Sequence, residues 1–258
     1  MVEYTGDWKD IPLIDVVEED NYLQNYDALN IIKEEINRLL QVYAAATGLS
    51  FASLIITPLS TLGMGALVSA GISFEYFRRI TRLHDTIKML LDSFGDGIKI
   101  TPRVKTNSAI IDLFIRMPDK RMFALVIRSS ENNAVRWRED TQQFYVKKKG
   151  KNEKKSEPLT RVIDELQTIF DLRKKKSPLM GITSSERSAP LIKAIVLAPG
   201  AAIASNNSPE IRTEFGEAQV LKIQTTSITY VAECNDLVKF LQLPKNKSPC
   251  GTKQDIMN

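Results

Sequence analysis

The chain has few of the residues that hold metals or cross-link a fold. Its 258 residues include two cysteines, Cys234 and Cys250, and a single histidine, His84. Two cysteines near the C-terminus exclude a disulfide scaffold and favour a reducing compartment, so we predict a cytoplasmic protein. These three residues are too few for a structural zinc site or a multi-histidine metal site. The composition, 43% hydrophobic and 26% charged, is that of one globular domain of ordinary size or two small ones.

Charge is distributed unevenly along the chain. Residues 1–40 hold ten acidic and three basic side chains, a net charge of −7, and the remaining 218 residues carry +11. The basic residues are concentrated in Lys147–Lys155 and in Arg173–Lys176. Such runs attract the phosphates of nucleic acid or of anionic lipid headgroups. The alternative is a solvated loop and a lysine-rich helix end, which suits the helix dipole.

Aromatic side chains lie among these basic residues. Aromatic rings interleaved with bases can stack on nucleobases while the charges follow the phosphate backbone. They can equally anchor a segment at a membrane surface or pack beneath a sheet. The predicted nucleic-acid-binding residues are Lys147, Lys148, Lys149, Lys151, Lys154, Lys155, Trp137 and Tyr145.

No charged residue occurs between Leu39 and Phe74, a run of 36 residues rich in Gly, Ala, Ser and Thr. Three alternatives remain open. One helix over Leu49–Ser73 crosses a bilayer once, since a span needs about 20 apolar residues. Alternatively, Thr57–Gly63 is a turn between two short apolar helices that form a shallow membrane hairpin or a packed pair. In the third alternative, both helices are buried in a soluble core or an oligomer interface, through residues 44–74.

The spacing of apolar residues predicts a mixed α/β fold. Apolar positions three or four apart predict helices, and alternating or short apolar runs predict strands. The predicted helices are Tyr22–Tyr43, Phe74–Phe94, Glu157–Lys176 and Asn235–Leu243, the last capped by Asn235. The predicted strands are Gly97–Val104, Ala109–Arg116, Met122–Ser129, Leu191–Leu197, Ala218–Ile223 and Ser227–Ala232. Residues 1–20 are predicted to be an acidic irregular arm, and residues 244–258 a disordered tail.

The segment Asn107–Ser129, NSAIIDLFIRMPDKRMFALVIRS, together with this order of elements, resembles the restriction-endonuclease-like superfamily of nucleases. The likeness is greatest to its nuclease-related and Holliday-resolvase-type branches, whose motif is PD-(D/E)xK. The resemblance implies a restriction-endonuclease-like mixed sheet flanked by helices over residues 75–243. The uncharged run favours a hydrophobic helical hairpin before it, within residues 21–74. It also implies an aspartate on one strand and Glu-x-Lys on the next, with carboxylates that bind a divalent metal.

The motif in this chain is incomplete. Asp112 matches the aspartate, but Val126 and Arg128 stand where the glutamate and lysine are expected. Glu131 could supply the missing carboxylate, as could Glu139 or Asp140, and Gln142 and Tyr145 match a glutamine and tyrosine that some branches carry on the next helix. The resemblance thus implies Asp112, Arg128 and Glu131 as catalytic residues, and Asp112 and Glu131 as ligands of Mg²⁺ or Mn²⁺ in an active enzyme. The alternative makes Asp112 an ordinary ion-pair partner of Arg128 or Arg116.

The function predicted from the sequence is nucleic-acid binding by a divergent, degenerate nuclease-like domain tethered by its apolar N-terminal region. One alternative is a non-catalytic scaffold at an anionic membrane surface or in protein interactions. Another is an active metal-dependent endonuclease in which the acidic residue has migrated. The predicted partners are nucleic acid, an anionic membrane and a second copy of the chain.

Overall fold

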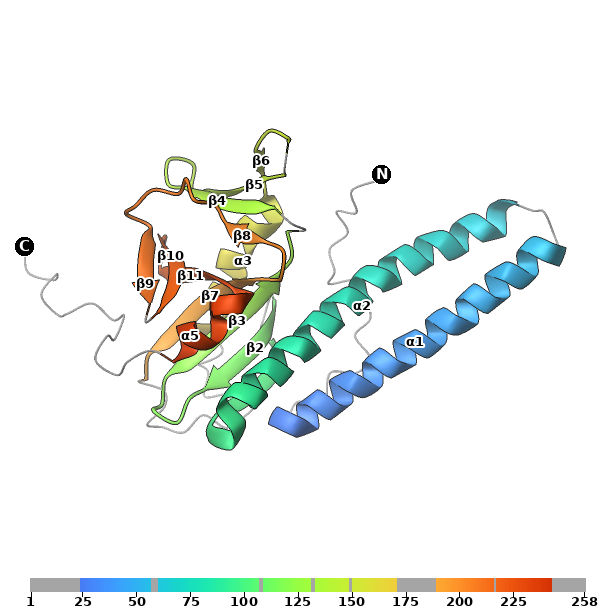
Figure 1. Cartoon of the computed structure of the whole chain (residues 1–258), viewed down its shortest axis with the longest axis horizontal. Helices are drawn as coiled ribbons and strands as arrows, with labels where there is room; N and C mark the ends of the chain where they lie inside the picture. The colour runs from blue at the N-terminus through green and yellow to red at the C-terminus, as the bar shows by residue number, and fades with distance from the viewer. Residues whose placement is uncertain are drawn as a thin grey trace, which may run out of the picture.

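The structure is a computed structural model that describes residues 24–56, 60–106, 109–130, 133–148, 150–170, 189–215 and 217–242. Within the first helices it describes the backbone of residues 45–56 and 60–73 but not their side chains. The predicted acidic arm, the Arg173–Lys176 run and the predicted C-terminal tail lie outside these ranges. The described residues form a mixed α/β fold of two sheets and flanking helices (Figure 1).

Two long helices open the described chain, α1 (Asn25–Ile56) and α2 (Ser60–Phe94). α2 contains the predicted helix Phe74–Phe94, and α1 contains the predicted helix Tyr22–Tyr43 from Asn25 onward. Both helices extend far into the uncharged run. Because α1 ends at Ile56 and α2 begins at Ser60, the prediction of one helix over Leu49–Ser73 is wrong. Among the residues whose side chains the structure describes, no helix is both long and apolar enough to cross a membrane.

The N-terminal half of α1 and the C-terminal half of α2 pack against each other and against the sheet. Glu35 on α1 accepts hydrogen bonds from Tyr76 on α2 and from Arg103, whose Nη1 lies 2.8 Å from Glu35 Oε2. The Tyr43 and Phe77 rings meet edge to face with centroids 6.2 Å apart. Further along, the paired helices extend beyond the sheet (Figure 1).

The larger sheet has seven strands in the order β1-β2-β3-β7-β11-β10-β9. Its first three strands are antiparallel neighbours, β3, β7 and β11 are parallel, and β11, β10 and β9 are antiparallel again. The sheet is therefore mixed, as the sequence predicts. Its strands are β1 (Lys99–Lys105), β2 (Ile110–Arg116), β3 (Met122–Arg128), β7 (Leu191–Leu197), β9 (Arg212–Phe215), β10 (Ala218–Gln224) and β11 (Ile228–Glu233).

Each face of this sheet buries a separate apolar core. On one face, α1, α2 and α5 (Leu237–Leu241) contribute residues such as Ile32, Ile87 and Phe240. On the other, α3 (Glu157–Gln167) contributes Leu159, Val162 and Leu166. The strands β3 and β7 are apolar on both faces because both are covered. A short 3-10 turn, η4 (Cys234–Asp236), precedes α5, so the predicted cap at Asn235 is wrong.

A second sheet, in the order β6-β5-β4-β8, lies on the same side as α3. It consists of β4 (Ala134–Arg138), β5 (Gln143–Lys147), β6 (Lys154–Lys155) and β8 (Ala202–Ile203). The sequence analysis missed all four strands. AVRWR and QFYVK do alternate as strands should, but each is short and carries basic side chains on its outer face, which masks the period.

Candidate functional site

Asp112 lies at a fork between two strands of the larger sheet. β2 and β3 pair from Leu113–Leu125 to Arg116–Met122, whereas Ile110–Asp112 of β2 has no partner on β3. β3 meanwhile stays paired with β7 as far as Arg128. The Asp112 carboxylate occupies the fork, because its Oδ2 accepts the Ile127 N–H at 2.7 Å. The carboxylate thus replaces a backbone acceptor where the two strands separate.

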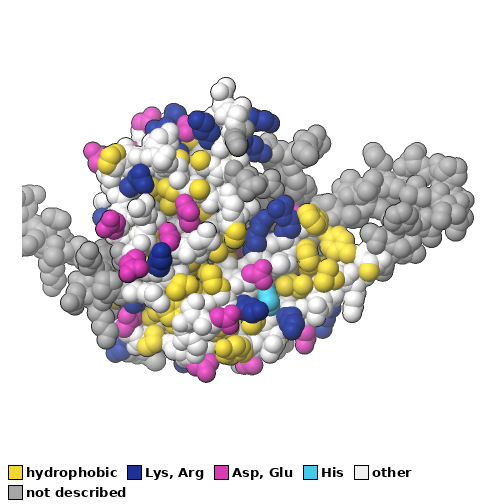
Figure 2. All heavy atoms as spheres, viewed as in Figure 1, with side chains coloured by type: hydrophobic (Ala, Val, Ile, Leu, Met, Phe, Trp, Pro, Cys, Tyr) yellow, Lys and Arg dark blue, Asp and Glu magenta, His cyan; other side chains and the backbone are white. Residues whose placement is uncertain are grey.

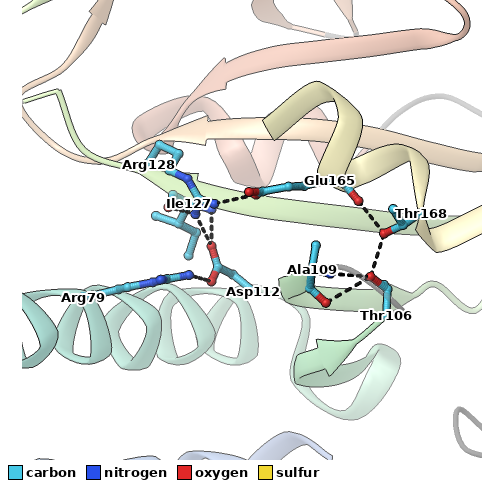
Figure 3. A network of polar contacts seen from close by, with 8 residues as sticks. All are labelled: Arg79, Thr106, Ala109, Asp112, Ile127, Arg128, Glu165 and Thr168. Atoms are coloured by element: carbon cyan, nitrogen blue, oxygen red, sulfur yellow. Dashed lines mark hydrogen bonds and ion pairs between the residues drawn. The ribbon is translucent and has the colours of Figure 1, made fainter. Parts of the chain in front are cut away.

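Two arginines and a second carboxylate complete a buried ionic network around Asp112 (Figure 3). Arg79 Nη2, from α2, lies 2.6 Å from Asp112 Oδ1, and Arg128 Nη1, from β3, lies 3.1 Å from Asp112 Oδ2. Arg128 Nη2 lies 3.0 Å from Glu165 Oε2 on α3. The Arg128 guanidinium therefore bridges two carboxylates, and the network brings helices from both faces of the sheet to one point.

The charges of this network offset the effect of burial on Asp112, whose exposed fraction is 4%. Burial raises the pKa of the Asp112 carboxyl, but the charges of Arg79 and Arg128 lower it by more, so the net pKa lies below its ordinary value. Burial lowers the pKa of Arg128, against the charge of Asp112. Asp112 is thus held as a carboxylate, paired rather than available as a base.

The residues present around Asp112 do not fit a divalent cation. Both carboxylate oxygens already accept hydrogen bonds from guanidinium or backbone N–H groups. A hard cation needs several oxygen ligands, and two guanidinium charges would repel it. Among the described residues, no group of three or more His, Cys, Asp and Glu side chains could hold a metal ion. The predicted ligand Glu131 lies outside the described residues.

The other predicted site residues lie away from this network. Glu139 and Asp140 are exposed at the turn between β4 and β5, and Gln142 is in the same turn with a φ of 49°. Tyr145 is on β5, so the expected placement of Gln142 and Tyr145 on a helix is wrong. Sequence reasoning missed Arg79 and Glu165 as partners of Asp112. Glu165 carried a signal, because it falls between the apolar positions Val162 and Leu166 of an amphipathic helix.

Basic side chains gather around β5 and β6, at the edge of the smaller sheet. Lys147, Lys148, Lys151, Lys154 and Lys155, here called the lysine surface, are all exposed, while Lys149 lies outside the described residues. Of the five, only Lys155 has a described ion pair, with Glu157 at 3.4 Å. Figure 2 shows Lys and Arg side chains along this edge of the molecule, interspersed with a few acidic ones.

The two aromatic residues predicted to stack on bases lie in different environments. Trp137 is only 4% exposed and packs edge to face on Phe144, with ring centroids 4.9 Å apart, inside the core beneath the smaller sheet. A ring so buried offers no face to a base, so the prediction for Trp137 is wrong and the packing alternative holds. Tyr145 is half-buried, and the Arg138 guanidinium lies 4.5 Å from its ring centroid.

Arg138 and its neighbour Arg136 are bound locally by one acidic residue. Arg138 Nη2 lies 2.9 Å and Arg136 Nη1 3.7 Å from the two carboxylate oxygens of Glu153. These pairs tie β4 to the segment that precedes β6. The arginines beside Tyr145 are therefore partly neutralised, whereas Lys147, Lys148, Lys151 and Lys154 have no described ion pair.

A comparison of the chain with protein-family models, curated proteins and solved structures finds no match.

Proposed function

We propose that this chain is a nucleic-acid-binding protein built on a restriction-endonuclease-like domain whose catalytic site is degenerate. The order of elements supports the fold assignment: α2, an antiparallel β1-β2-β3 meander, α3, and then β7 parallel to β3. The aspartate of the resembling motif, Asp112, also lies where β2 and β3 separate.

The geometry around Asp112 favours a non-catalytic role for this site. An arginine guanidinium joins Asp112 to Glu165, and a second arginine binds the other oxygen of Asp112. The guanidinium groups of Arg79 and Arg128 thus neutralise the carboxylates that a nuclease would present to a metal ion. We therefore expect no Mg²⁺- or Mn²⁺-dependent cleavage of nucleic acid by this protein.

The observation that carries the binding proposal is the lysine surface. Five exposed lysines lie on one sheet edge, and residues 134–157 hold eight basic and four acidic side chains. Each lysine that neutralises a phosphate releases counterions, so affinity falls steeply as salt rises. β6 also pairs only with β5 in the smaller sheet, which leaves its other edge without a neighbouring strand.

The test is a salt titration of binding to duplex DNA and to single-stranded RNA. Replacing Lys147, Lys148, Lys151, Lys154 and Lys155 by glutamine should lower affinity and reduce the slope of log K against log salt by up to about 4 on duplex DNA. The matched control replaces five other exposed lysines by glutamine, namely Lys33, Lys88, Lys99, Lys105 and Lys120. Both variants lose the same net charge.

The control variant should keep most of the wild-type affinity and salt slope. An equal loss in both variants would show that net charge, and not the lysine surface, governs binding. Absence of any nucleic-acid retention by the wild type at low salt would refute the proposal, and vesicles with anionic lipids would be the next probe.

A nicking assay with Mg²⁺ or Mn²⁺ tests the degenerate site separately. We expect no cleavage by the wild type, and none by Asp112→Asn or Glu131→Gln. Robust wild-type cleavage that disappears in Asp112→Asn would make this protein an enzyme and overturn the proposed degeneracy. Cleavage that persists in Asp112→Asn would point to a contaminating nuclease.

A further inference from the structure

The uncharged run coincides with one structural feature, the distal part of the two-helix arm. Leu39–Ile56 forms the second half of α1, and Ser60–Phe74 the first part of α2. These portions, here called the apolar arm, extend past the sheet in Figure 1. Two of the alternatives left open by the sequence had two short apolar helices, and the structure gives uncharged helical segments of 18 and 15 residues.

Each segment of the apolar arm is somewhat shorter than the hydrocarbon layer of a bilayer is thick, so the arm can enter this layer as a hairpin. At 1.5 Å per residue, its two segments are about 27 Å and about 22 Å long. A bilayer core is about 30 Å thick, and helices satisfy their own backbone hydrogen bonds inside it. Both segments are rich in Gly, Ala and Ser. Such small residues allow helices to approach closely in lipid.

The base of the apolar arm has the features of a membrane–water boundary. Charged side chains begin on both helices next to it, with Glu34 and Arg38 on α1 and Glu75 and Arg78 on α2. Large apolar side chains are exposed at the same place: Leu40 at 48%, Val42 at 63% and Phe74 at 54%. Figure 2 shows hydrophobic side chains gathered where the arm meets the rest of the molecule.

Aromatic side chains also mark this boundary. Tyr43, near the base of the apolar arm on α1, and Phe77, just outside the arm on α2, contact each other across the two helices. Aromatic residues are enriched at both interfaces of a membrane, where an apolar ring meets the headgroups. Exposed apolar patches on soluble proteins are usually small, and larger ones mark interaction surfaces.

We propose that the apolar arm inserts into a lipid bilayer as a helical hairpin, with the α/β domain held at the surface. Because α1 and α2 lie side by side, the chain enters and leaves the bilayer on the same side. The basic residues at the base of α2, Arg78, Arg79 and Arg82, favour the cytoplasmic side. This inference does not depend on the proposed nucleic-acid binding.

The experiment uses the full chain, synthesised in a cell-free system with phosphatidylcholine vesicles and floated through a density gradient in 1 M NaCl. Neutral lipid and high salt remove any attraction through the lysine surface. We expect the protein to float with the vesicles. Trypsin should then release the α/β domain, while the peptide Leu39–Arg78, which has no Lys or Arg before its end, stays with the vesicles.

Two variants show whether the apolar arm is responsible. Leu54→Arg, in the arm, should lower the vesicle partition coefficient by about 100-fold, since an arginine in the hydrocarbon core is strongly disfavoured. Ile31→Arg, at an exposed position of α1 below the arm, should float like the wild type. Light scattering without vesicles records self-association in parallel.

Two results would overturn membrane insertion. The first is a wild-type chain that stays at the bottom of the gradient, and if it is oligomeric there, a second copy covers the arm instead. The second is equal flotation of the wild type and Leu54→Arg, which would show that another part of the chain binds the vesicles.

Discussion

Asp112 holds together parts of the chain that are far apart in the sequence. Its carboxylate contacts α2 through Arg79, β3 through the Ile127 N–H and Arg128, and α3 indirectly through Glu165. A buried ion pair adds little net stability, but removing one partner leaves an uncompensated charge. The sequence analysis singled out Asp112, and one of the two roles considered for it, an ion pair with Arg128, is present in the structure. It gave no indication of Arg79, because no pattern links a helix residue to a strand 33 positions later.

Replacing Asp112 by asparagine should destabilise the fold by about 3 kcal/mol at pH 7, because Arg79 and Arg128 lose their shared counter-charge. The amide oxygen can still accept the Ile127 N–H, so the effect reports on charge. Since the pKa of Asp112 is lowered in the folded state, its contribution is present above about pH 4 and is lost as pH falls below that value.

Urea unfolding of wild type and Asp112→Asn at pH 7 and pH 3 measures both effects. The difference between the two proteins should be large at pH 7 and should shrink at pH 3. Asp140→Asn, at an exposed position, is the control and should match the wild type. A difference that does not change with pH would show that the ion pairs are not its source.

Lys193 is a buried lysine of β7 with an amide and a hydroxyl as its hydrogen-bond partners. Its Nζ donates to Gln167 Oε1 at 2.8 Å and also contacts Ser227, and it lies 5.2 Å from the Phe170 ring centroid. Burial lowers the pKa of Lys193 to about 8. A charged lysine at this position therefore destabilises the fold at neutral pH.

Lys193→Met should raise the free energy of unfolding at pH 6.5, and the gain should disappear toward pH 10. Between about pH 8 and the ordinary lysine pKa near 10.4, the unfolded chain binds more protons, so wild-type stability rises with pH. The change corresponds to about 3 kcal/mol at most. Thermal unfolding of both proteins across this range is the measurement, with the partly exposed Lys222→Met as control. A pH-independent difference would contradict the assignment.

Among the helices and strands, the sequence predicted the bounds best for strands that are buried on both faces. β7 has the predicted bounds, and β3 differs by one residue, because buried strands are continuous apolar runs bounded by turns. α3 begins at Glu157 as predicted and ends at Gln167, and the predicted helix end at Lys176 lies outside the described residues. The small sheet was harder to predict because its strands are short and partly exposed, and one of its pairings is distant in sequence: β8 joins β4 across 68 residues.

The start of α1 is fixed to the edge strand β1 by a single side chain. Asn25 Oδ1 accepts the Ile100 N–H and Asn25 Nδ2 donates to the Ile98 carbonyl, both at 2.8 Å. The amide therefore pairs with the free edge of β1 as another strand would. Asn25 itself has a φ of 51°, a left-handed conformation that asparagine tolerates better than most residues.

Asn25→Ala should destabilise the protein by about 1–3 kcal/mol, since two hydrogen bonds are lost and the Ile100 N–H is left without a partner. The loss should appear as faster hydrogen exchange in the first turns of α1 and at Ile100, with little change in β7. Asn30→Ala, at an exposed position of the same helix, is the control. If hydrogen exchange became faster throughout the sheet as well, α1 and the sheet would unfold together, and Asn25 would not hold the start of α1 independently.

At the scale of the whole molecule, the first helix belongs to two environments. Its N-terminal half contributes Ile32 to the core on one face of the larger sheet and Glu35 to a buried contact with Arg103. Its C-terminal half forms one side of the apolar arm. The sequence predicted a helical region over residues 21–74 and an α/β domain over residues 75–243. Composition marks where charge stops, but only tertiary contacts reveal that α1 belongs to the core of the α/β domain, which it contacts through Leu29, Ile32, Ile36 and Leu39.

Removing the apolar arm alone should therefore leave the fold intact, whereas removing all of α1 should not. In the first variant, a six-residue Gly-Ser linker joins Ala44 to Phe74, a gap that the Tyr43–Phe77 contact shows to be short. We expect a monomer that no longer floats with vesicles, unfolds cooperatively near the wild-type temperature and keeps the salt-dependent nucleic-acid binding of the lysine surface. In the comparison variant, the chain begins at Phe74 and loses Asn25, Ile32 and Glu35, so its melting temperature should fall by several degrees or more. Calorimetry and light scattering of both variants are the measurements. If the linker variant has a melting temperature as low as that of the shorter chain, the apolar arm stabilises the α/β domain directly and does not act only in membrane insertion.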